Sequence, residues 1–111
     1  MNEKIMESEN GNFTLYKRTG LGREDTEFTT LEVVSSDDAS KYVIEIRFNS
    51  DSPNFNGQKV KYKIHDCYIA YGLRQASNTD QDIKTFIQVL NEALRFETKI
   101  RYYLETVGDN Y

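Results

Sequence analysis

The chain has 111 residues, of which 38% are hydrophobic and 29% charged, and its net charge is −4 at neutral pH. This length permits one modest hydrophobic core and excludes two, while the 13% aromatic content excludes a disordered chain. No apolar run is long enough to span a membrane, and residues 1–12 lack the apolar stretch of a signal peptide. We therefore expect a cytoplasmic protein with no membrane partner. The single cysteine, Cys67, excludes an internal disulfide and agrees with a reducing compartment.

The first part of the chain predicts an arm and two strands. Residues 1–11 show no hydrophobic periodicity, so we expect a loose N-terminal arm, with residues 12–111 forming a single domain. Alternation of apolar and polar residues over 12–17 predicts the first strand. Residues 27–34 are rich in Thr and Val and predict the second, with a bulge near Thr29 because Phe28 is out of phase.

Two further strands follow. Residues 42–48 alternate most cleanly and predict a central strand. In residues 59–64, apolar side chains alternate with lysines, but the pattern becomes ambiguous from His65 to Tyr71. One long bent strand, or a strand plus a short fifth segment, would fit. The connections have hairpin length, so the pattern favours a two-layer α+β fold in which an antiparallel meander of four, possibly five, strands is covered on one face by a helix.

The last third of the chain predicts one long C-terminal helix over residues 78–107. Asn78 and Thr79 are good N-cap residues, with Asp82 in the first turn, and no Pro or Gly follows until Gly108. A break within residues 96–99, giving two shorter helices, is the alternative.

This helix carries two apolar stripes. The first, Ile83, Ile87, Leu90 and Leu94, ends early, and we expect it to pack on the sheet. The second continues to the C-terminus with heptad spacing, beyond the reach of the small sheet that this sequence predicts. We therefore expect it to form a homodimer interface, with the contact residues Val89, Phe96, Ile100, Tyr103 and Val107.

The chemistry-bearing residues do not form a recognisable catalytic set. His65 and Cys67 are two apart on a predicted strand, where side chains start about 6 to 7 Å apart, too far for a nucleophile and its base. The glycines of residues 19–23 lie between strands, so they predict a turn rather than a phosphate-binding loop. The acids show no ligand spacing for a metal. We expect no catalytic residue, no metal and no cofactor, and hence no enzyme.

The remaining candidate site is a basic sheet face made by Arg47, Lys59, Lys61 and Lys63. Such a face suits either contact with a protein or, as the alternative, single-stranded nucleic acid. The acidic total and the eight tyrosines favour protein binding, so we expect a small inhibitor, adaptor or immunity-type factor that occupies a partner's surface. The richness in Asn, Lys, Ile and Tyr is typical of an AT-rich genome, which favours a phage or mobile element of a low-GC bacterium as the source.

Overall fold

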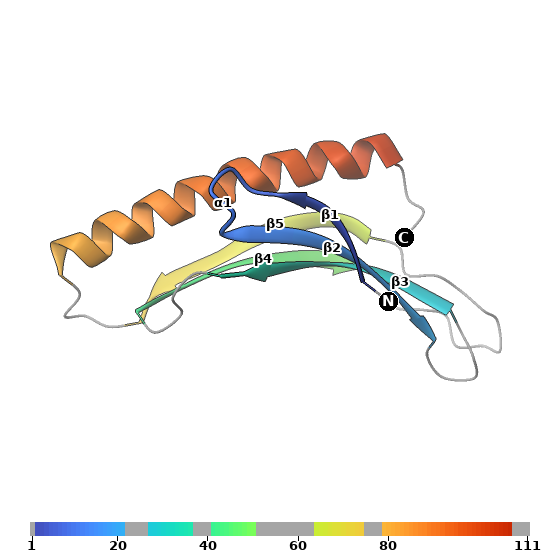
Figure 1. Cartoon of the computed structure of the whole chain (residues 1–111), viewed down its shortest axis with the longest axis horizontal. Coiled ribbons are helices and arrows are strands. Elements are labelled where there is room, and N and C mark those ends of the chain that lie inside the picture. The colour runs from blue at the N-terminus through green and yellow to red at the C-terminus, as the bar shows by residue number, and fades with distance from the viewer. Residues whose placement is uncertain (1, 22–26, 37–40, 51–63, 75–78, 108–111) are drawn as a thin grey trace.

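The structure, a computed structural model, describes residues 2–21, 27–36, 41–50, 64–74 and 79–107. Within these ranges the fold is α+β, with antiparallel strands followed by one long C-terminal helix (Figure 1). The elements are β1 (Asn2–Glu7), β2 (Phe13–Leu21), β3 (Glu27–Ser35), β4 (Tyr42–Ser50), β5 (Ile64–Leu73) and α1 (Asp80–Val107).

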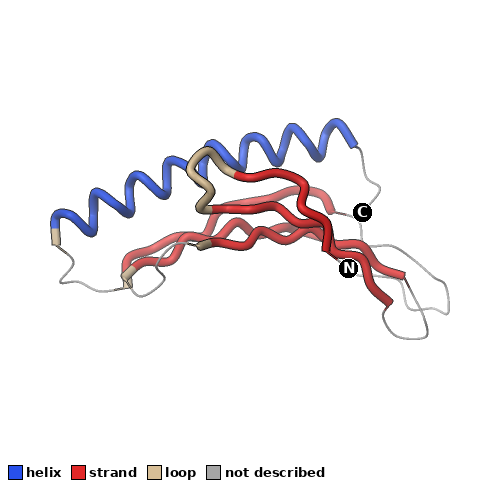
Figure 2. Tube along the Cα trace, viewed as in Figure 1, coloured by secondary structure: helices blue, strands red, loops and turns tan. Residues whose placement is uncertain are grey.

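The described strands form two hydrogen-bonded sheets. One has the order β1-β2-β3 and the other pairs β4 with β5. β3 contacts β4, so the two sheets lie next to each other, and α1 contacts β4 and β5. Figure 2 shows the helix on one side of the strands, which leaves the opposite side of the sheets without a covering element in the part of the chain that the structure describes.

The N-terminal arm is ordered, and the prediction that residues 1–11 are loose is wrong. Asn2–Glu7 forms β1 and pairs antiparallel with β2. The register shifts between Lys4 and Met6, which is where Ile5 and Met6 stand next to each other, both partly buried against the core. A bulge places successive residues out of the usual alternation, so this strand lacks the two-residue period that sequence analysis requires.

The second and third strands are longer and more regular than predicted. β2 continues through Gly20 to Leu21, and its pairing with β3 runs without a register shift from Phe13 opposite Ser35 to Leu21 opposite Glu27. The bulge expected near Thr29 is therefore absent from this ladder. The fourth predicted strand, residues 59–71, is described from Ile64 onward as β5, while residues 59–63 lie outside the described ranges.

The helix is continuous from Asp80 to Val107, so the alternative with a break at residues 96–99 is wrong. Its start is fixed by reciprocal hydrogen bonds. The backbone amide of Asp82 donates to Oγ1 of Thr79 at 3.2 Å, and the amide of Thr79 donates to Oδ2 of Asp82 at 3.1 Å. Two backbone donors that the first turn would leave unpaired are thereby satisfied. Lys41 Nζ also donates to Asp82 at 2.9 Å, which ties this end of the helix to the start of β4.

Replacing Thr79 by Ala removes the acceptor for the Asp82 amide, and we expect it to lower the free energy of unfolding by about 1 kcal/mol. Chemical denaturation of the wild type and the Thr79→Ala variant measures this difference. Thr106→Ala at the other end of the helix is the control, because its hydroxyl donates to a carbonyl of the preceding turn and caps no free amide. A Thr79→Ala variant as stable as the wild type would show that the capping contact contributes nothing.

The core is closed by the second apolar stripe of α1, not by the first, so the predicted assignment of the two faces is reversed. Val89, Phe96 and Ile100 are 8%, 1% and 0% exposed, and they pack with side chains of β2, β3, β4 and β5. By contrast, Ile83, Ile87 and Leu94 of the first stripe are exposed.

The reversal has a simple cause. β2, β3 and β4 each have nine residues, which corresponds to about 30 Å of extended chain, so the sheet reaches further along the helix than the sequence predicts. The longer stripe matches this length, and it continues to Leu104, which is also buried. Burying the longer stripe removes more apolar surface from water.

Candidate interaction surfaces

The described residues of the predicted dimer interface contact the core of the single chain. Val89, Phe96 and Ile100 belong to its core, and Tyr103 is partly buried against it. The side chain of Val107 lies outside what the structure describes. The described members of the predicted interface are therefore occupied by contacts within one chain, and a dimer would have to use other side chains.

The predicted basic face is only partly described, and its described member is not a free cation. Arg47 is exposed, and its guanidinium contacts Glu45, with Nη2 2.5 Å and Nε 2.8 Å from Oε2. The hydrogen bond and the charge of Glu45 raise the pKa of Arg47. Lys59, Lys61 and Lys63 lie outside the described residues.

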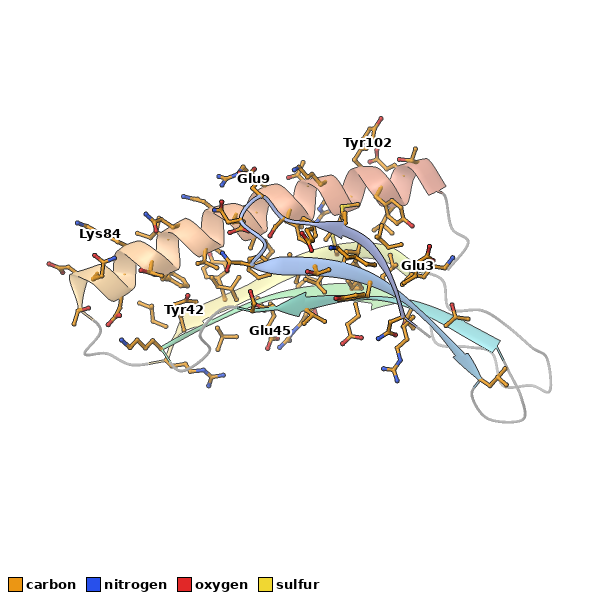
Figure 3. The ribbon with its side chains drawn as sticks, in the orientation of Figure 1. Glu3, Glu9, Tyr42, Glu45, Lys84 and Tyr102 are labelled. Carbon is orange, nitrogen blue, oxygen red and sulfur yellow. The ribbon has the colours of Figure 1, made fainter. Side chains whose placement is uncertain are left out.

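Arg47 and Glu45 lie on the side of the strands that faces away from α1, which we call the open sheet face. Figure 3 shows Glu45 on that side, while Tyr42 lies on the helix side. Side chains alternate between the two faces of a strand, and the pairing of β2 with β3 and of β4 with β5 carries this alternation across the sheets. With the pairing of β1 and β2 included, the described members of the open sheet face with large or charged side chains are Lys4, Glu7, Tyr16, Arg18, Glu32, Val34, Val43, Glu45, Arg47, Tyr68 and Arg74.

Cys67 is buried, and the structure gives it a packing role. Its Sγ donates to the backbone carbonyl of Glu97 at 3.9 Å, and its own carbonyl accepts from Nη2 of Arg101 at 2.7 Å. The strand is thus attached to the C-terminal half of α1 at this point. His65 lies in β5, but its side chain is not among those described.

The described residues contain neither a cluster of metal ligands nor a membrane-spanning helix. No three His, Cys, Asp or Glu side chains come together there in a way that could hold a metal ion. No helix in that part of the chain is long and apolar enough to cross a membrane.

Sequence analysis missed a buried carboxylate, Glu92, in the middle of α1. It is 1% exposed, and it accepts hydrogen bonds from the turn between β1 and β2. Ser8 Oγ lies 2.5 Å and the Asn10 amide 3.0 Å from Oε2, while the side-chain amide of Asn12 lies 2.7 Å from Oε1. The Asn12 backbone amide adds a further contact to Oε2, at 3.2 Å. A polar turn is thereby attached to the helix beside the hydrophobic core.

This cluster keeps Glu92 ionised. Burial acts to raise its pKa, but the hydrogen bonds from Ser8 and Asn12 and from the backbone amides of Asn10 and Asn12 outweigh that effect, so the pKa lies below its ordinary value. A carboxylate held in this way is a poor proton donor near neutral pH. Its acceptor positions are already occupied by the turn, which indicates a structural anchor rather than an acid or base for catalysis.

The sequence did contain a signal for Glu92. The residue stands three positions after Val89 and four before Phe96, so it falls beside the core stripe of the helix. An acid at such a position needs hydrogen-bond donors when it is buried. Of the residues that supply them, Ser8 and Asn10 belong to the predicted loose arm, and Asn12 begins the first predicted strand.

A pocket of about 360 Å³ lies beside this anchor, between the turn and the first half of α1. Its lining is largely uncharged and polar, and comprises Asn10, Asn12, Ser36, Tyr42, Thr85, Gln88, Val89 and Glu92. Glu92 is the carboxylate among them, and it already accepts hydrogen bonds from the turn between β1 and β2. The lining therefore offers amide and hydroxyl contacts and lacks a nucleophile paired with a base.

The other flank of α1 is apolar and exposed. Ile83, Ile87 and Leu94 are exposed there, and Leu90 is partly buried. The contact of Arg101, on the same side of the helix, with Cys67 shows that this flank faces β5.

Exposed apolar side chains of β5 continue the surface. Tyr71 and Leu73 are exposed, and the ring of Tyr71 lies 6.3 Å from that of Phe86. We call the side chains of Ile69, Tyr71, Leu73, Ile83, Ile87, Leu90 and Leu94 the β5 flank. Contiguous exposed apolar surface of this kind marks interaction sites in soluble proteins.

Comparison of the chain with protein-family models, with curated proteins and with solved structures found no match.

Proposed function

We propose that the protein is a small non-enzymatic protein-binding module, an inhibitor, adaptor or immunity-type factor, that acts by covering a partner's surface with its open sheet face. The observation that supports this is the composition of that face. Tyr16, Tyr68 and Val34 lie there together with the ion pair of Glu45 and Arg47. Tyrosine and arginine around exposed apolar groups are typical of protein interfaces, where tyrosine adds contact area at low entropic cost.

The charges on this face favour a protein partner over nucleic acid. Lys4, Arg18, Arg47 and Arg74 share the face with Glu7, Glu32 and Glu45, so its described charges nearly balance. A phosphate backbone attracts unpaired cations and is repelled by carboxylates. The partner that fits is a protein surface with charges of both signs around an apolar centre. Single-stranded nucleic-acid binding depends on Lys59, Lys61 and Lys63, which lie outside the described residues.

A pull-down with matched variants tests the proposal. The double variant Val34→Asp, Arg47→Glu makes the face acidic and removes an exposed apolar contact and the ion pair, without touching the core. We expect the immobilised wild type to retain a protein from a lysate of the host cell and the double variant to bind that protein at least about 30-fold more weakly, the effect of losing one strong contact.

Tyr102→Asp is the control, because Tyr102 is exposed on the outer side of α1, away from the strands (Figure 3). It should retain the partner as the wild type does. The proposal fails if the double variant binds equally well, or if the recovered material is nucleic acid and nuclease removes the signal. In the second case, Ser in place of Lys59, Lys61 and Lys63 should abolish the salt dependence of binding.

A further inference from the structure

Next to the β5 flank lies the edge of β5 that faces away from β4, and no other described strand pairs with it. The backbone amide of Arg74 donates to the carbonyl of Lys41 at 2.8 Å, in register with the pairing of β4 and β5. Hydrogen-bonded and non-hydrogen-bonded pairs alternate along an antiparallel ladder. The amides and carbonyls of Ile69, Tyr71 and Leu73 therefore point away from β4, to the outer edge of β5.

Arg101 marks one end of this edge. It donates to the carbonyl of Cys67 at 2.7 Å, which agrees with an outward direction for the carbonyls of odd-numbered residues. Among the described strands, β5 pairs with β4 alone. A strand edge that is flanked by exposed apolar side chains pairs readily with another strand.

We propose that the β5 flank binds a second copy of this chain, with the outer edges of the two β5 strands paired antiparallel about a two-fold axis that passes near Tyr71 and Ile87. The resulting dimer would have one continuous sheet, with the two helices side by side on the same face. The surface shares with the open sheet face only the β5 positions Tyr68 and Arg74 and consists otherwise of the β5 edge and helix-side residues, so the inference does not depend on the proposed function.

The sequence of β5 is complementary to itself about that axis. On the helix side, Tyr71 meets its own copy, and Ile69 lies opposite Leu73 of the second copy. On the other side, Tyr68 lies opposite Arg74 of the second copy, a pairing of an aromatic ring with a cation that is favourable. Between residues 68 and 74 no like charges face each other, and cross-strand pairs of these kinds stabilise antiparallel sheets.

The position of the helix also fits. α1 contacts both β4 and β5, so its axis lies over the region between them. With strands about 4.8 Å apart, two helices related by the axis would be about 10 Å apart. Packed helices usually lie 8 to 10 Å apart, so neither a gap nor a clash separates them.

The side chains between the helices are the exposed apolar ones. Ile87, which is 49% exposed, follows Phe86, whose ring is 6.3 Å from that of Tyr71. An axis near Tyr71 therefore brings Ile87 close to its own copy, with Ile83 and Leu90 on either side. A two-fold contact uses the same patch on both chains, as this arrangement requires.

Sedimentation equilibrium on the full chain and on two variants tests the proposal. We expect the wild type to be a dimer at micromolar concentration. Ile87→Glu places two carboxylates at the axis, so it should raise the dimer dissociation constant at least about 100-fold while circular dichroism shows an unchanged fold. Tyr71→Pro should also give a folded monomer. The substitution removes the backbone N–H of residue 71, which points away from β4, so the only hydrogen bond lost is the one to the partner strand.

Tyr102→Glu is the matched control, since it puts the same charge on the exposed outer side of the same helix and should remain dimeric. A wild type that is still monomeric at about 200 μM would overturn the inference, because this concentration is about 100 times the micromolar concentration at which we expect the dimer. So would an Ile87→Glu variant that dimerises as strongly as the wild type. Neither result bears on capture of a partner by the open sheet face, which is measured with Val34→Asp, Arg47→Glu.

Discussion

Replacing Glu92 by Ala is expected to lower the free energy of unfolding by about 3 kcal/mol, because buried donors that now bind a carboxylate lose their acceptor. Ser8, Asn10 and Asn12 all donate to Glu92. For a domain of this size, the loss corresponds to a fall in Tm of about 10 to 20 °C. Thermal and chemical denaturation measure both quantities.

Glu105→Ala is the control, because Glu105 is an exposed acid on the same helix, and its loss should change stability by no more than about 0.5 kcal/mol. If Glu92→Ala proved as stable as the Glu105 variant, the cluster would contribute nothing to the fold. Hydrogen exchange adds a local readout, since the amides of Asn10 and Asn12 should lose protection first.

The same residue determines how stability depends on pH. The folded-state pKa of Glu92 lies below its ordinary value, so its contribution is fully present above the unfolded-state pKa, about 4.3, and is lost as the pH falls through the folded-state pKa. The wild type should be more stable than Glu92→Gln near neutral pH, and the difference should narrow below about pH 4. Urea denaturation between pH 7 and pH 3 measures the difference, and a constant gap over this range would be inconsistent with the assignment.

The structural features that could be predicted from the sequence are the local ones. Thr79 and Asp82 signal the start of the helix, and the absence of Pro and Gly signals its continuity. The structure confirms the helix over almost its predicted length. The strand predicted from the alternation in residues 42–48 is likewise confirmed as β4. Caps and alternation depend on neighbours within a few residues, which the sequence displays directly.

The features that could not be predicted depend on distant parts of the chain. Which stripe of α1 is buried depends on the length of the sheet, and β2 continues to Leu21 through residues in which the sequence predicts a turn. Glu92 is stabilised by donors about 80 residues away. A helix with two apolar stripes fits either orientation until the sheet it covers is known.

Replacing Ile100 by Glu is expected to abolish folding. Ile100 is 0% exposed and packs in the core, so the new carboxylate would be buried without a partner or would force the helix off the sheet. The cost is at least about 4 kcal/mol, close to the whole stability of many small domains, so circular dichroism should show a largely unfolded chain at 25 °C.

Ile87→Glu is the control. Ile87 lies 13 positions earlier, on the first apolar stripe of α1, and its side chain is exposed, so this variant should keep the fold. The pair of variants distinguishes the two stripes directly. A folded, monomeric Ile100→Glu variant of a dimeric wild type would instead show that Ile100 lies at an interface between copies.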